Sequence, residues 1–243
     1  MNAWQALFWG GFSSASLYLG EALSGPMAKA YKATGLVMGF GAGTLLSAIA
    51  YELVPESSLS QVGGVGLGFG VGALAYYVGD HFIDRRGGHE RQSIDEAQSS
   101  DGAGAAMFLG ALLDGLPEAF VLGIGIQLGG AISVAFVAAV FISNIPQGIA
   151  GTTSLREAGY TGRHVFWMWT ALSSAAALTA TVGYLLGDTI GEQGIYAQAF
   201  AAGAVLTMLA DSMMPEAFKH GGKAVGLLTV LGYAVATGLT AIE

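Results

Sequence analysis

Long apolar segments alternate with short polar breaks along the 243-residue chain. A helix that crosses a bilayer needs roughly 20 mostly apolar residues, and the pattern predicts eight such spans. They cover residues 2–22, 35–54, 63–83, 103–127, 131–154, 163–187, 195–218 and 223–241. The longest polar break, residues 84–102, mixes charges of both signs with serine and glycine, which predicts a mobile loop. We therefore expect residues 1–243 to form a single transmembrane domain.

The composition agrees with this interpretation. Hydrophobic residues make up 53% of the chain and charged residues only 11%, whereas a soluble domain has about 25% charged residues. We expect an all-α integral membrane protein whose surroundings are the lipid bilayer. The formal net charge of −8 argues against nucleic acid as a partner. The absence of cysteine excludes a disulfide framework and a thiolate metal site.

The basic residues predict the orientation. All of them fall in alternate loops or at the edges of those loops, and they are Lys29, Lys32, Arg85, Arg86, Arg91, Arg156, Arg163, Lys219 and Lys223. Cytoplasmic loops collect Lys and Arg, so we expect loops 1, 3, 5 and 7 inside and both termini outside a cell (inner) membrane. The N-terminal "MNAWQALFWG" lacks the basic region of a cleaved signal peptide, and we expect the first span to be retained.

A segment of the chain is repeated with an offset of 160 residues. "GFGAGTLLSAIAYELVPES" (39–57) and "AFAAGAVLTMLADSMMPEA" (199–217) share Phe, Ala, Gly, Leu, Ala, Pro and Glu at equivalent positions. These segments are the second and seventh spans, which run in opposite directions. The pattern favours an inverted-topology repeat, a common plan of transporters with a site near the midplane. The alternative is a chance likeness between two spans rich in glycine and alanine.

Two spans carry polar residues near the predicted middle of the bilayer. In "ALLDGLPEAF" the acids Asp114 and Glu118 are four residues apart, and in "FISNIPQGIA" Ser143 and Gln147 have the same spacing. Residues at i and i+4 share a helix face. A charge at the bilayer centre costs about 2.5–3.5 kcal/mol, so such residues usually face a pathway or a partner. The pattern favours a cation site between spans 4 and 5; the alternative is a protonated acid pair that only ties helices together.

These motifs resemble a known family. "DGLPEAF" and "SNIPQGIAGTTSLREAG" resemble the fourth and fifth spans of the ZIP (Zrt-/Irt-like) divalent metal transporters, and the repeated segments resemble that family's second and seventh spans. The resemblance covers essentially the whole chain. It implies inverted three-helix repeats, spans 1–3 and 6–8, around a central helix pair, spans 4 and 5. It also implies a dinuclear metal centre between spans 4 and 5, assisted by a glutamate on span 6, and a homodimer.

Several ligands of that family are replaced in this chain. In span 4, Asp114 stands where the family has its first histidine and Gly115 where it has asparagine, while Glu118 retains the glutamate. In span 5, Ser143 replaces histidine or glutamine and Gln147 replaces a glutamate, while Asn144 fits the pattern. Span 6 has no acid at the family position, near residues 176 and 177. Zinc prefers Cys and His ligands, whereas oxygen ligands suit harder ions. The residues therefore favour one weaker site, whose candidate ligands are Asp114, Glu118, Ser143, Asn144 and Gln147.

Other polar residues have less specific roles. Glu52 and Asp211 occupy neighbouring positions in the two repeated segments and could line the approaches to the site, with interfacial helix caps as the alternative. A cluster at the end of the third span could collect metal, although a solvated helix end is the favoured interpretation; it contains Asp80, His81, Asp84 and His89.

The sequence thus favours a ZIP-like divalent metal cation transporter, with Zn, Mn or Fe as the transported substrate and no resident cofactor. The glycine-rich segment 64–72 has no P-loop lysine, so no nucleotide motif indicates a pump. The alternative is a ZIP-fold protein that has lost metal transport and acts as a binding or regulatory protein. An intramembrane aspartyl hydrolase is disfavoured because "YYVGD" lacks the first glycine of a Gly-x-Gly-Asp motif, and we do not expect an enzyme.

Overall fold

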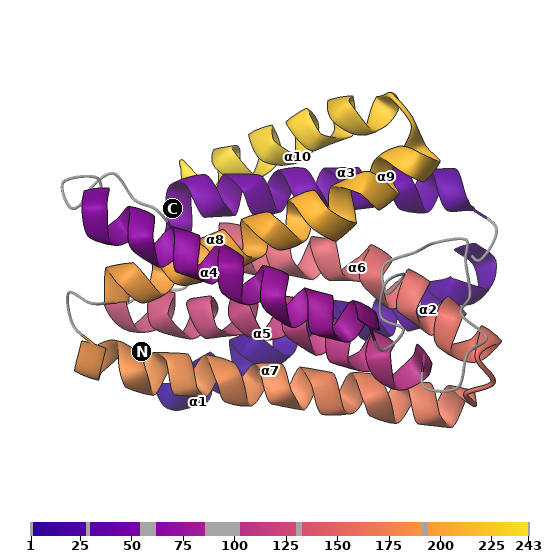
Figure 1. The fold of residues 1–243 in the computed structure, drawn as a ribbon, viewed down its shortest axis with the longest axis horizontal. Helices are drawn as coiled ribbons and strands as arrows, with labels where there is room; N and C mark the ends of the chain where they lie inside the picture. Colours follow the sequence, from indigo (N-terminus) through magenta and orange to yellow (C-terminus); the bar gives the residue numbers. More distant parts are fainter. Residues whose placement is uncertain are drawn as a thin grey trace.

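The computed structural model describes residues 2–27, 30–53, 62–85, 103–129, 133–190 and 194–242, and throughout these residues the regular elements are helices (Figure 1). In chain order they are α1 (Ala3–Ser14), α2 (Ser16–Met27), α3 (Tyr31–Ala48), the π-helix η1 (Ile49–Leu53), α4 (Val62–Ile83), α5 (Ala103–Gly129), α6 (Val134–Glu157), α7 (Gly162–Ile190), α8 (Gly194–Met208), the π-helix η5 (Leu209–Met213), α9 (Met214–Gly221) and α10 (Ala224–Thr240).

Within the described residues, five helical segments are long and apolar enough to cross a membrane. They are Tyr31–Leu53, Phe108–Leu128, Val134–Glu157, Gly162–Gly187 and Ile195–Gly221, and the apolar helix Ala224–Thr240 is shorter. Large apolar side chains are exposed on α1, α4, α7 and α10, among them Phe8, Leu67, Leu74, Leu178, Leu227 and Val230. A bilayer would cover such side chains with lipid chains. The protein therefore has the helices of a multi-pass membrane protein, as the sequence predicted.

The first predicted span, residues 2–22, consists of two helices. Asn2 and Gln5 form a capping box at the start of α1. At its end, the hydroxyls of Ser13 and Ser14 both donate to the Gly10 carbonyl, at 3.0 and 3.3 Å. Side-chain hydrogen bonds of this kind compete with the backbone hydrogen bonds of a helix. The Ala15 N–H donates to the Phe12 carbonyl, three residues earlier, which interrupts the α-helical pattern. The chain therefore changes helix at Ala15, close to the polar residues of α6 described below.

α6 lies in the middle of the bundle. It packs against α1, α2, α3, α5 and α10, while α5 packs against α7 and α8 (Figure 1). Its buried residues cover most of its circumference, which is typical of a helix surrounded by others. Between α6 and α7, the Trp169 indole N–H donates to the Thr152 hydroxyl at 2.9 Å, so that the buried polar group has a partner. A central position for α5 and α6 places their polar residues away from lipid.

The helix pairs α3–α10 and α4–α8 make equivalent close contacts. A Cβ atom at Gly43 of α3 would collide with the Thr229 carbonyl of α10, and one at Gly203 of α8 would collide with the Phe69 carbonyl of α4. Glycine is required where backbones approach this closely. The two glycines are 160 residues apart, and so are the two carbonyls that they face. A second set of contacts has the same offset: a Cβ atom at Gly72 would collide with the Phe200 carbonyl, and one at Gly232 with the Phe40 carbonyl.

The two π-helices have the same offset. η1 directly follows α3 and η5 directly follows α8, and each begins and ends 160 residues from its counterpart. A π-helix, with hydrogen bonds from i to i+5, is rare and is frequently found at functional sites. The residues of the two π-helices differ, IAYEL against LADSM, so it is the backbone geometry that recurs in the two halves of the chain.

Basic residues gather at one end of the bundle. Both chain termini lie at one end, and the turns between α6 and α7 and between α9 and α10 lie at the other (Figure 1). The basic residues of these two turns are Arg156, Arg163, Lys219 and Lys223. Part of the predicted loop 84–102, residues 86–102, lies outside the described residues. The described turns thus place basic residues at the end opposite the termini.

Candidate metal site between α5 and α6

α5 and α6 continue through their prolines. Pro117 lies inside α5 and Pro146 inside α6, where each ring removes one backbone hydrogen bond. The polar residues flanking these prolines are buried: Asp114 and Glu118 are each 3% exposed, and Ser143 and Asn144 are each 5% exposed. The sequence analysis singled out these side chains, and the structure places all of them in the protein interior.

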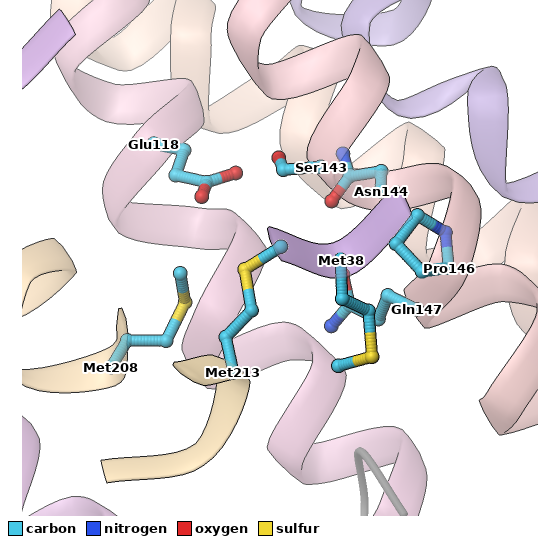
Figure 2. Close-up of a pocket in the computed structure, with 8 residues that line it drawn as sticks. All are labelled: Met38, Glu118, Ser143, Asn144, Pro146, Gln147, Met208 and Met213. Carbon is cyan, nitrogen blue, oxygen red and sulfur yellow. The ribbon is translucent and has the colours of Figure 1, made fainter. Parts of the chain in front are cut away.

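A small cavity lies between α5 and α6. Its volume is about 10 Å³, which is about the room needed by one water-sized particle. Its lining comes from α3, α5, α6, α8 and η5 and consists of Met38, Glu118, Ser143, Asn144, Pro146, Gln147, Met208 and Met213. Figure 2 shows Glu118, Ser143 and Asn144 along one edge and the three methionines along the other. Four of the five candidate ligands from the sequence therefore share one cavity.

Glu118 is the carboxylate of this cavity. Its side chain extends toward Ser143 and Asn144 (Figure 2), and among the described residues it makes no hydrogen bond or ion pair. Burying an ionised carboxylate without a partner costs several kcal/mol. A proton or a cation is needed to offset that cost. Glu118 is therefore the strongest single indication of a ligand in the described part of the chain.

Asp114 lies beside the cavity and does not line it. Its Oδ1 accepts a hydrogen bond of 2.6 Å from the Tyr76 hydroxyl of α4, and its Oδ2 accepts one of 3.3 Å from Nε2 of Gln147. Because a carboxylate only accepts, Gln147 must turn its amide nitrogen toward Asp114. The Gln147 side-chain carbonyl oxygen is then the end of the amide that is available to the cavity.

Ser143 and Asn144 present oxygen atoms as well. The Ser143 hydroxyl donates to the Val140 carbonyl at 2.9 Å, which leaves its lone pairs available. Asn144 Nδ2 donates to the Ser13 carbonyl at 3.5 Å, at the break between α1 and α2. Its carbonyl oxygen is then the free end of the amide. The cavity can thus offer a cation the Glu118 carboxylate, one hydroxyl and two amide oxygens.

Sequence reasoning missed the methionines. It considered oxygen ligands only, but Met38, Met208 and Met213 add three thioethers to the lining. An isolated methionine in an apolar span carries no signal, because methionine usually fills gaps in a core. Among the described residues, no three His, Cys, Asp or Glu side chains come together as a metal site. In the described residues, Glu118 is thus the only acidic side chain in the cavity lining.

The resemblance implies a glutamate on α7 near residues 176 and 177, of which Ala176 is buried and Ala177 is half-buried. Ala176 is 0% exposed and packs with Ala119 and Ala180. A Cβ atom at Gly10 of α1 would lie only 3.1 Å from the Ala176 carbonyl, so α1 also approaches this point closely. Neither Ala176 nor Ala177 supplies a carboxylate. The assistance from span 6 that the ZIP resemblance implies therefore has no counterpart at this position.

Glu52 and Asp211 lie in the two π-helices and do not line the cavity. Glu52 in η1 accepts a hydrogen bond of 3.1 Å from the Thr240 hydroxyl, and Asp211 in η5 is exposed. Their role along a pathway stays a prediction. The cluster at the end of α4 does not form a metal site among its described members, Asp80, His81 and Asp84, and His89 lies outside the described residues.

Comparison with known proteins gives one informative likeness. No family model matches the chain. A protein of Arabidopsis thaliana named "Putative zinc transporter" is 24% identical over 193 residues, which cover 76% of this chain and 30% of that protein. The chain therefore spans less than a third of the length of this relative. At this identity the likeness is distant, although it extends over most of the described helices.

Proposed function

We propose that this chain is a ZIP-like transporter that carries a transition-metal cation such as Zn²⁺, Mn²⁺ or Fe²⁺ across the membrane, through a site between α5 and α6. The observation that carries this proposal is Glu118, a buried carboxylate that faces a cavity and has no partner among the described residues. The distant likeness to a protein named as a zinc transporter supports the same class of substrate. So do the motifs around the two central prolines, which resemble those of ZIP transporters.

The electrostatics favour a cation over an empty site. A charged carboxylate in the middle of a membrane costs about 2.5–3.5 kcal/mol on insertion scales, and a bound cation offsets that cost without requiring a proton. The oxygen atoms of Ser143, Asn144 and Gln147 can complete the coordination. Carbonyl, hydroxyl and carboxylate oxygens suit divalent ions that do not demand imidazole or thiolate. A reversible site of modest affinity is appropriate for a transporter, which must also release its ion.

An inverted-repeat architecture is part of the proposal. The equivalent contacts of α3–α10 and α4–α8, and the equivalent π-helices, support eight spans in which spans 1–3 and 6–8 are repeats around α5 and α6. In such transporters the ion site lies between the repeats near the midplane, and rocking of one part against the other opens it to alternate sides. The basic turns opposite the termini support the predicted orientation with both termini outside.

The alternative is a ZIP-like membrane protein that binds a partner or an ion and does not transport. The observation that favours it is the lack, among the described residues, of three grouped His, Cys, Asp or Glu side chains. A homodimer, which the resemblance also implies, is compatible with either function.

Metal uptake into proteoliposomes tests the proposal. Wild-type protein should carry at least one of Zn²⁺, Mn²⁺ and Fe²⁺ inward, and Glu118→Gln should reduce uptake at least tenfold because it removes the cavity's carboxylate. Glu157→Gln is the matched control, since Glu157 is exposed at the end of α6. Uptake that is equal in all three proteins would show that ions do not use this site. Binding without uptake, measured by calorimetry, would favour the alternative function.

A further inference from the structure

Three methionine side chains line the edge of the cavity opposite Ser143 and Asn144 (Figure 2). Met38 comes from α3, Met208 from the end of α8 and Met213 from η5. They are buried, at 1%, 4% and 3% exposure. A thioether is soft and polarisable. One side of the cavity therefore offers sulfur, and the other side offers oxygen.

The π-helix η5 is what brings two of these methionines to one place. Met208 and Met213 are five residues apart, and on an α-helix with 3.6 residues per turn they would point in directions about 140° apart. In η5 the hydrogen bonds run from i to i+5, as in the bond from the Met214 N–H to the Leu209 carbonyl. Residues five apart then lie nearer to one face than they would in an α-helix. Both methionines line the cavity.

Sulfur ligands change the choice of ion. Soft thioethers select Cu(I), whereas carboxylates, carbonyls and water suit harder ions such as Mn²⁺. Glu118 is, within the described residues, the one carboxylate of the lining, and a single negative charge matches the charge of a monovalent cation. Asp114 is engaged by Tyr76 and Gln147 beside the cavity. The described lining contains no histidine, so the strongest zinc ligand available to this cysteine-free chain is missing from it.

On the basis of the proposed function, we infer that this cavity binds a soft, thiophilic monovalent ion, Cu(I) or its analogue Ag(I), through the thioethers of Met208 and Met213 with Glu118 as the counter-charge. The inference extends the substrate class from divalent ions to soft monovalent ions. It also gives η5 a role, which is to position two of the ligands. The ion would bind more tightly than Zn²⁺ does at the same site.

Titration with Ag(I) tests the inference directly, because Ag(I) needs no reductant. The purified full chain is titrated with silver nitrate in chloride-free buffer, and with Zn²⁺ in parallel. We expect Ag(I) to bind at least tenfold more tightly than Zn²⁺. The variant with Met208→Leu and Met213→Leu should weaken Ag(I) binding at least tenfold. Met214→Leu, next in the chain and absent from the cavity lining, should bind Ag(I) as wild type does.

X-ray absorption at the silver edge of the Ag(I)-bound wild-type chain gives a second measurement that needs no variant to fold. It should show sulfur in the first shell of silver. A first shell of oxygen and nitrogen only, or Ag(I) binding that the double variant leaves intact, would overturn the inference. Glu118-dependent Zn²⁺ uptake without Ag(I) binding would overturn the inference and leave the proposed function standing. Failure of Ag(I) to bind, together with failure of Zn²⁺, Mn²⁺ and Fe²⁺ to enter, would refute both proposals.

Discussion

Replacing Gln147 by glutamate supplies the charge that the resemblance to ZIP transporters implies at this position, and the structure allows its effect to be worked out. Nε2 of Gln147 donates to Oδ2 of Asp114 at 3.3 Å. In Gln147→Glu without metal, two carboxylate oxygens would meet at this distance, with Glu118 also on the cavity. Two unit charges 4 Å apart repel by about 4 kcal/mol at an effective dielectric constant of 20. This repulsion is about as large as the cost of protonating one of the acids at pH 7, so proton uptake can relieve it.

Proton uptake limits the loss of stability. Keeping a glutamic acid of ordinary acidity protonated at pH 7 costs about 3.7 kcal/mol, and the protonated acid can again donate to Asp114. The metal-free variant should therefore be less stable than wild type by about 3–4 kcal/mol at pH 7. For a chain of this size that corresponds to a melting temperature lower by roughly 6–16 °C. The folded variant then binds one proton more than the unfolded chain, so its deficit shrinks as the pH falls and disappears near pH 4.

Metal should reverse this loss. A divalent ion displaces the proton and holds both carboxylates, which makes affinity higher at pH 7 and more steeply dependent on pH than in wild type. At 100 times its dissociation constant the ion stabilises the folded state by about 2.7 kcal/mol. Melting can be followed by the fluorescence of the four tryptophans, with and without Zn²⁺ or Mn²⁺ and from pH 5 to pH 8. The matched control is Gln127→Glu, because Gln127 of α5 is absent from the cavity lining.

One result would refute the proposal of a single cation site between α5 and α6. If Gln147→Glu melts like wild type at every pH and gains no stability or affinity with metal, residues 114–118 and 143–147 do not form one cation site. The non-transporting alternative would then be the better account of the chain.

Three further predictions concern a hydrogen bond, the orientation and the choice of ion. Tyr76→Phe removes the short hydrogen bond to the buried Asp114 and should lower the free energy of unfolding by about 1.5–3 kcal/mol. The control is Tyr77→Phe, at an exposed position of α4, which should melt like wild type. Equal melting of the two variants would show that this hydrogen bond does not stabilise the protein. Because the chain has no cysteine, single cysteines can be introduced as labelling sites. Cysteines at residues 60 and 190 should label from outside intact cells, and one at residue 92 should not. Labelling of residue 92 from outside would show that the predicted orientation is wrong. Calorimetry should show weaker Zn²⁺ binding than in a histidine-containing relative and little discrimination against Mn²⁺ or Fe²⁺, and a submicromolar, zinc-selective site would contradict this expectation.

The sequence by itself determined the class of the protein and the helices that carry its polar residues. Apolar segments of about 20 residues predict spans because bilayer thickness sets their length, and α3, α6 and α7 lie close to the predicted ranges. The pairing of Asp114 with Glu118 and of Ser143 with Gln147 follows from helix periodicity, which is local. The offset of 160 residues was also visible in the sequence, and the structure shows equivalent close contacts at Gly43 and Gly203, two glycines of the repeated segments.

Only the tertiary structure decided which of these side chains face the cavity. Asp114 turns to Tyr76, 38 residues earlier in the chain, and this contact depends on how α4 packs beside α5. The methionines come from α3, α8 and η5, and nothing near them in sequence marks them as ligands. The π-helical register that aligns Met208 with Met213 leaves no pattern in residue type, because η1 and η5 share geometry and differ in sequence. Local periodicity fixes the face of a helix, whereas the partners of that face depend on packing between segments far apart in the chain.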